Sequence, residues 1–161
     1  MQSPTVPRRD VLRGAAAFTA ASYSRIRGAN DKVRLGVIGT GDRGRHDMTQ
    51  FQLTGQVDVT AVCDIYSAQI DQARQKAPDA RNFTDHRKLL EYRELDVVLV
   101  ATPDHWHAET AIDALTAGKD VYVEKPLSLT LEEGPRIVKA ARVNDRICQV
   151  GMQQRSGKHY L

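Results

Sequence analysis

Three glycines and one aspartate have the spacing of a nucleotide-binding site. Gly39, Gly41 and Gly44 form a Gly-x-Gly-x-x-Gly pattern, and Asp64 follows the last of them by twenty positions. In such a pattern the first glycine permits a tight turn, the second lets the backbone approach a pyrophosphate, and the third lets a helix pack closely on a strand. A carboxylate after the next strand would accept hydrogen bonds from ribose hydroxyls. The pattern therefore predicts a dinucleotide site; the alternative is a plain glycine turn in an unrelated α/β domain.

This prediction requires a strand before the glycines and a helix after them. Residues 33–38 form a short apolar run, as a buried parallel strand does, and residues 43–53 place apolar side chains on one helical face. The unpaired N–H groups that begin such a helix attract phosphate. We expect the loop residues that contact a dinucleotide to be Gly39, Thr40, Gly41, Asp42, Arg43 and Gly44.

Strand-like and helix-like segments alternate along the rest of the chain. Further strands are expected at 57–63, near 82–84, and at 96–101, 119–123 and 146–151. Helices are expected at 67–77, around 89–90, from an N-cap at Asp104 through Ala117, and from Thr130 or Pro135 onward. Thr130 and Glu133 have the spacing of a capping box, in which the glutamate reaches back to the start of the helix. The alternation predicts an α/β fold, a doubly wound parallel sheet covered by helices on both faces, with the strand order 3-2-1-4-5-6.

The positive net charge of +3 belongs to the N-terminal segment. Residues 1–34 contain seven Arg or Lys and two Asp, a charge of +5, which leaves −2 for the remainder. The predicted folded part therefore has no basic excess that favours nucleic acid. We expect no nucleic-acid partner.

The first thirty residues resemble an export signal. Arg8-Arg9 begins a stretch similar to the twin-arginine motif, and the apolar segment 14–21 is too short to span a membrane. The twin-arginine route carries folded proteins, which suits a protein that keeps a cofactor. We expect residues 1–30 to be signal and linker, 31–155 to be the dinucleotide-binding domain, and the protein to be periplasmic. The alternative is a basic tail on a cytoplasmic protein.

Neither the histidines nor the cysteines predict a metal site. His105 and His107 are two positions apart, and such residues do not face each other on a helix. Cys63 and Cys148 lie in apolar runs without metal-ligand spacing, and we interpret them as small buried side chains.

Two further segments carry a family resemblance. Residues 101–107 are ATPDHWH and residues 117–126 are AGKDVYVEKP, each at the end of a predicted strand. Together with GVIGTGDRG and VCDIY, they resemble the N-terminal domain of the glucose–fructose oxidoreductase / inositol dehydrogenase / MocA (Gfo/Idh/MocA) family, over residues 33 to about 155. Glu124-Lys125-Pro126 matches the signature triplet of that family. The resemblance implies hydride transfer between a nicotinamide cofactor and a hydroxyl group of a sugar or polyol.

The resemblance also implies roles for residues at two strand ends. The family's triplet lysine lies beside the nicotinamide and the substrate hydroxyl, so Lys125 is the expected catalytic residue and, with Glu124, part of the cofactor site. A cation there would favour the alkoxide that develops as hydride leaves. The alternative from spacing alone is a solvated lysine before a proline.

A second loop and a late arginine complete the expected site. Thr102 and Pro103 resemble the family's loop that passes the cofactor. His105 or Trp106 is expected to line the cofactor cleft while His107 packs. Arg155 would hold substrate oxygen atoms or the domain junction, or else is a simple surface arginine.

Asp64 also predicts the choice of cofactor. A carboxylate accepts from the ribose 2′-hydroxyl and repels a 2′-phosphate. Residues 65–69 contain no Arg or Lys that could bind that phosphate. We expect NAD rather than NADP.

In the family, a second α/β domain usually follows the point where this chain stops, and supplies most of the substrate pocket and the oligomer interface. We expect residues 156–161 to begin that domain, a homo-oligomer only where that domain is present, and no turnover from this chain alone. Two alternatives remain: an NAD-dependent glycosidase of the same superfamily, and a nucleotide-binding module that is not an enzyme.

Overall fold

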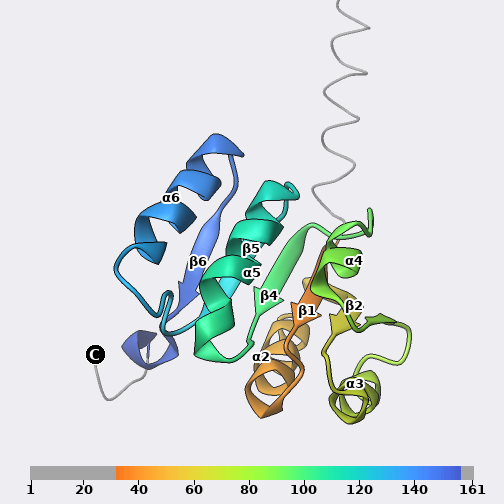
Figure 1. The fold of residues 1–161 in the computed structure, drawn as a ribbon. Coiled ribbons are helices and arrows are strands. Elements are labelled where there is room, and N and C mark those ends of the chain that lie inside the picture. Colours follow the sequence, from red (N-terminus) through yellow and green to blue (C-terminus); the bar gives the residue numbers. More distant parts are fainter. Residues whose placement is uncertain (1–31, 157–161) are drawn as a thin grey trace, which may run out of the picture. The chain divides into compact units, whose positions relative to one another are not determined.

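Six parallel strands form one sheet in the order β3-β2-β1-β4-β5-β6 (Figure 1). The structure, a computed structural model, describes residues 32–156. The predicted export signal and nearly all of segment 156–161 lie outside the described residues. The strands are β1 (Val33–Ile38), β2 (Val57–Cys63), β3 (Arg81–Phe83), β4 (Val97–Val100), β5 (Asp120–Glu124) and β6 (Cys148–Gly151). The predicted doubly wound order is confirmed.

Helices cover both faces of this sheet (Figure 1). They are α2 (Asp42–Leu53), α3 (Ser67–Arg74), α4 (His86–Leu90), α5 (Asp104–Thr116) and α6 (Glu133–Val143), and a 3₁₀ turn, η2 (Gln153–Ser156), follows β6. Adjacent β1 residues point to opposite faces. Val37 therefore packs with Met48 of α2 and Ile70 of α3, whereas Ile38 belongs to the cluster that contains Leu115 of α5. Burial on both faces explains the nearly continuous apolar strands.

Three helix boundaries differ from the predictions. Helix α6 begins at Glu133, between the two predicted starts. The Glu133 carboxylate accepts the N–H groups of Leu129 and Thr130 at 2.7 and 3.2 Å, so the predicted reach back to Thr130 forms, but in the loop before the helix. Pro135 is the third helical residue, where its missing N–H costs no hydrogen bond within the helix. Helix α3 ends at Arg74 rather than 77, and α5 begins at Asp104 with Pro103 in the cap position.

The edge position of β6 changes one burial prediction. Cys63 is buried at the end of β2, as predicted. Cys148 is only half-buried, because β6 has a neighbour on one side only. The expectation that both cysteines are buried is therefore wrong for Cys148.

The strand order creates the crevice in which ligands bind to such sheets. Strand β1 pairs with β2 on one side and with β4 on the other. The connections after β1 and β4 therefore leave in different directions at the carboxyl edge, and the gap between them is the switch point that binds dinucleotides.

Candidate functional site

Each glycine of the loop after β1 has a different constraint. Gly39 has φ +86°, and a Cβ there would lie 2.5 Å from the carbonyl oxygen of Ala101. A Cβ on Gly44 would collide with the carbonyl oxygen of Gly39. A Cβ on Gly41 would meet no heavy atom within 4 Å. The protein's own packing thus explains Gly39 and Gly44, whereas the space beside Gly41 suits a closely approaching ligand.

Helix α2 begins directly behind this space. Its cap residue is Gly41, and no side chain caps the first turn. The first N–H groups of a helix have no acceptor within the helix, and they carry a partial positive charge. The start of α2 can therefore receive a pyrophosphate, which places Asp42 and Arg43 beside the predicted path of the cofactor.

The carboxylate of Asp64 is anchored to the same loop. One oxygen accepts the N–H of Thr40 at 2.8 Å and its hydroxyl at 3.3 Å, and the other accepts the N–H of Tyr66 at 3.0 Å. Each carboxylate oxygen can accept more than one hydrogen bond. Asp64 is thus held in a fixed orientation and keeps acceptor capacity for ribose hydroxyls.

A cleft of about 520 Å³ opens at the carboxyl edge beside Asp64. This volume is in the usual range of ligand sites, about 300–1,000 Å³. The structure brings five predicted residues together in its wall: Gly39, Asp64, Thr102, Pro103 and His105. Trp106 also lines the cleft. The Thr102 hydroxyl is buried and has no hydrogen-bond partner among the described residues, so a ligand in the cleft could satisfy it.

Sequence reasoning missed several residues of the same wall. They are Ile65 after β2, Thr84 and Asp85 after β3, His86 and Arg87 at the start of α4, and Thr110 of α5. No local pattern marks the residues after β3, because only the pairing of β2 with β3 places them beside Asp64.

The second part of the predicted site lies at the end of β5. Glu124 is 3% exposed, and one of its oxygens accepts from Arg43 Nη2 at 2.8 Å. The same Nη2 is 2.8 Å from the carboxylate of Asp47, one turn further along α2. Burial, opposed in part by Arg43 and reinforced by Glu124, raises the pKa of Asp47 to about 6. Arg43 therefore ties α2 to β5, a role that its predicted contact with the cofactor did not include.

Lys125 is exposed just after this buried cluster, and its N–H donates to the Glu124 carboxylate at 3.3 Å. His107 supports the same turn from α5. Its ring is 1% exposed, with Nδ1 2.7 Å from the carbonyl oxygen of Pro126 and Nε2 2.8 Å from that of Thr102. His107 thus bridges the loop that carries Thr102 and the turn that carries Lys125.

Arg155 lies on the exposed η2 turn. Its N–H donates to the carbonyl oxygen of Met152 at 2.9 Å. Within residues 32–156, no group of three or more His, Cys, Asp or Glu side chains is arranged to hold a metal ion. In the same part of the chain, no helix is both long and apolar enough to cross a membrane.

Comparison with known proteins identifies the family. The model of the GFO_IDH_MocA oxidoreductase family, which has an NAD-binding Rossmann fold, matches residues 33–152. The chain belongs to this family. NAD is accordingly the cofactor of this domain, and the family resemblance seen in the sequence is confirmed.

Curated relatives of this Gfo/Idh/MocA domain include glycosidases. The chain is 36% identical over 138 residues to an alpha-N-acetylgalactosaminidase of Shewanella oneidensis, which covers 80% of this chain and 30% of that protein. It is 36% identical over 140 residues to a glycosyl hydrolase family 109 protein of a Shewanella species, with 81% and 30% covered. The chain thus spans about a third of the length of these relatives.

Solved structures of similar fold include reductases and dehydrogenases. The WlbA dehydrogenase of Bordetella pertussis, in complex with NADH and UDP-GlcNAcA, has a TM-score of 0.75 at 27% identity, covering 80% of this chain and 39% of that one. The myo-inositol 2-dehydrogenase of Lactobacillus plantarum has a TM-score of 0.73 at 26% identity, with 80% and 38% covered. Biliverdin reductase of Synechocystis, in complex with biliverdin and NADP+, has a TM-score of 0.71 at 27% identity, with 76% and 39% covered.

Proposed function

We propose that this chain is the cofactor-binding part of an enzyme that moves hydride between nicotinamide and a carbon bearing a hydroxyl group in a sugar or polyol. The observation that carries the proposal is the open space beside Gly41, since the protein itself gives no reason for a glycine there. The sugar-type substrate is supported by a neighbour of similar fold whose complex contains UDP-GlcNAcA.

NAD, when bound, supplies the hydride acceptor or donor. The chain's own residues would position it: the start of α2 would hold the pyrophosphate, Asp64 would accept from the adenosine ribose, and Thr102 would donate from the loop after β4. The side-chain nitrogen of Lys125 is proposed to face the substrate hydroxyl. As an amine it would take the hydroxyl proton while hydride leaves the carbon for NAD, and as an ammonium it would return that proton to the oxygen when the carbonyl is reduced.

We also propose a preference for NAD over NADP. It is supported by Asp64, whose carboxylate is fixed by two backbone N–H groups and would repel a 2′-phosphate.

The test is a titration of the 161-residue chain with NADH and NADPH. Emission from Trp106, the chain's single tryptophan, provides the readout because this side chain lines the cleft. We expect NADH to bind and NADPH to bind more weakly. A folded sample that binds neither at millimolar concentration would refute the cofactor role; tighter binding of NADPH would refute only the preference.

A glycosidase is the second candidate, favoured by the curated relatives. Such an enzyme would use bound NAD for a transient oxidation, followed by elimination and re-addition, so this domain would serve both reactions. A protein that carries this chain together with a substrate domain distinguishes them. Release of the aryl group from an aryl N-acetylgalactosaminide without net NADH indicates a glycosidase; NADH formed in proportion to oxidised polyol indicates a dehydrogenase.

A further inference from the structure

Arg87 lies in the same cleft as Asp64, although the two are far apart in sequence. Parallel pairing of β2 and β3 sets Cys63 opposite Phe83, and the N–H of Asp64 donates to the carbonyl oxygen of Phe83 at 3.2 Å. Paired strands are about 4.8 Å apart. The residues that follow both strands, Asp64 on one and Asp85 to Arg87 on the other, therefore line one wall.

A guanidinium at this place has the chemistry that accommodates a ribose 2′-phosphate. Arg87 is the only Arg or Lys among the described residues that line the cleft, and its side chain is 73% exposed. The position of Arg87 alone would therefore favour NADP, against the preference that Asp64 gives.

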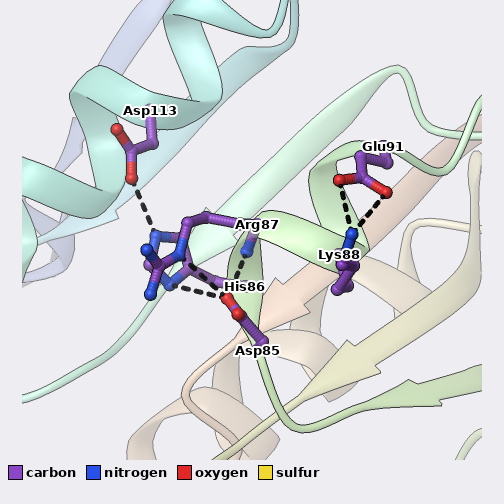
Figure 2. Close-up of polar contacts among 6 residues, drawn as sticks. All are labelled: Asp85, His86, Arg87, Lys88, Glu91 and Asp113. Atoms are coloured by element: carbon purple, nitrogen blue, oxygen red, sulfur yellow. Dashed lines mark hydrogen bonds and ion pairs between the residues drawn. The ribbon is translucent and has the colours of Figure 1, made fainter.

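Asp85 pairs with one edge of that guanidinium, through Arg87 Nε. Its Oδ1 accepts from Arg87 Nε at 3.2 Å and from the Arg87 backbone N–H at 2.9 Å (Figure 2). These contacts, the backbone hydrogen bond first, hold the pKa of Asp85 below its ordinary value, so the carboxylate stays charged at neutral pH.

We propose that Asp85 is a second determinant of cofactor choice, because it pairs with Arg87 and so withholds this guanidinium from a 2′-phosphate. The inference rests on the proposed preference for NAD. A 2′-phosphate, with a charge near −2, would meet two carboxylates and a cation that is already paired. The preference then depends on two strand ends, β2 and β3, and not on Asp64 alone.

Asp85→Asn tests the proposal with little risk to the fold. Asp85 caps α4, and asparagine is as good a cap as aspartate, so the helix keeps its start while the charge is lost. Asp85→Ser is a second capping variant. The control is Lys88→Gln. Lys88 pairs with Glu91 at 2.9 Å on the other side of α4 (Figure 2), and it lines a different pocket.

The ligands are AMP and adenosine 2′,5′-bisphosphate, which isolate the adenosine end, followed by NADH and NADPH. The full 161-residue chain is used, with Trp106 emission as the readout. In Asp85→Asn we expect the bisphosphate to bind about tenfold more tightly than in the wild type, with AMP affinity unchanged. Arg87→Gln in that background should abolish the gain, and Lys88→Gln should change nothing.

Two results would overturn the proposal. One is an unchanged ratio of bisphosphate to AMP affinity in both capping variants. The other is a gain that persists after Arg87→Gln, because loss of the carboxylate charge would then explain it without Arg87. A wild-type chain that binds neither AMP nor NADH would instead refute the proposed function, and the inference would fall with it.

Discussion

Gly41→Ser is expected to separate stability from cofactor binding. The Gly41 backbone has φ −61° and ψ −174°, an extended conformation open to any residue, and a Cβ there meets no heavy atom within 4 Å. Serine is slightly preferred to glycine at a helix N-cap, and replacing a glycine whose conformation tolerates a side chain reduces the entropy of the unfolded chain. We expect the free energy of unfolding to rise by about 0.5–1 kcal/mol, or roughly 1–4 °C in Tm.

The same side chain would occupy the predicted path of the pyrophosphate. Hydrogen bonds to charged groups contribute about 1.5–3 kcal/mol each, so displacing the phosphate from even one N–H group should weaken NADH binding about 10- to 100-fold. Titration monitored by Trp106 emission measures the affinity, and thermal unfolding measures the stability.

Gly44→Ala is the contrasting control. Its Cβ would collide with the carbonyl oxygen of Gly39, so it should cost about 1–3 kcal/mol of stability. Wild-type NADH affinity in Gly41→Ser would show that the pyrophosphate passes elsewhere. A lower Tm in that variant would show that the space beside Gly41 serves the fold.

Three further predictions concern other parts of the chain. The raised pKa of Asp47, about 6, means that its contribution to stability is complete below about pH 4 and is lost as the pH rises through 6. Asp47→Asn should therefore make the free energy of unfolding, measured with urea, depend less on pH between about 4 and 6. An unchanged pH dependence would refute the assignment. Four inter-strand steps, about 19 Å, separate β2 from β6, so both cysteines should be free thiols. Burial raises both thiol pKa values, to about 12 for the buried Cys63, so an aromatic disulfide reagent should modify the half-buried Cys148 first; a Cys63–Cys148 disulfide in peptide mapping would contradict the strand order. Residues 1–30, fused to a reporter that is exported in the folded state, should direct the reporter to the periplasm. Changing both residues of Arg8-Arg9 to lysine should abolish this export. Export that survives the change would refute the twin-arginine interpretation.

Local patterns were sufficient to predict the sheet. The glycine loop identifies β1 and α2, and apolar runs such as 97–100 identify strands that are buried on both faces. The start of α6 was harder to place, because Thr130 and Pro135 each favour a different first residue. The structure uses Glu133 to satisfy loop N–H groups and begins the helix there.

The residues that sequence reasoning missed are those placed by tertiary contacts. Asp85 and Arg87 reach the cleft through the pairing of β2 with β3. The predicted strand order contains that pairing, but no motif marks the residues that follow the short strand β3. Asp47 did leave a signal. It lies three positions after Gly44 and four before Phe51, on the helical face that packs against the sheet, and a carboxylate there requires a partner.

The two ends of the candidate site are held in different ways, and this difference bears on catalysis. The adenosine end is local: Asp64 is anchored to the adjoining loop by the N–H of Thr40. The Lys125 end is assembled across the sheet, since Arg43 joins α2 to Glu124, and His107 joins the loop after β4 to the turn after β5. A catalytic group must be held within a fraction of an ångström of its working position. These two bridges, one through the half-buried Arg43 and one through the buried His107, connect the turn that carries Lys125 to the glycine loop and to the loop after β4. We therefore expect the backbone position of Lys125 relative to a bound NAD to be set before any substrate arrives.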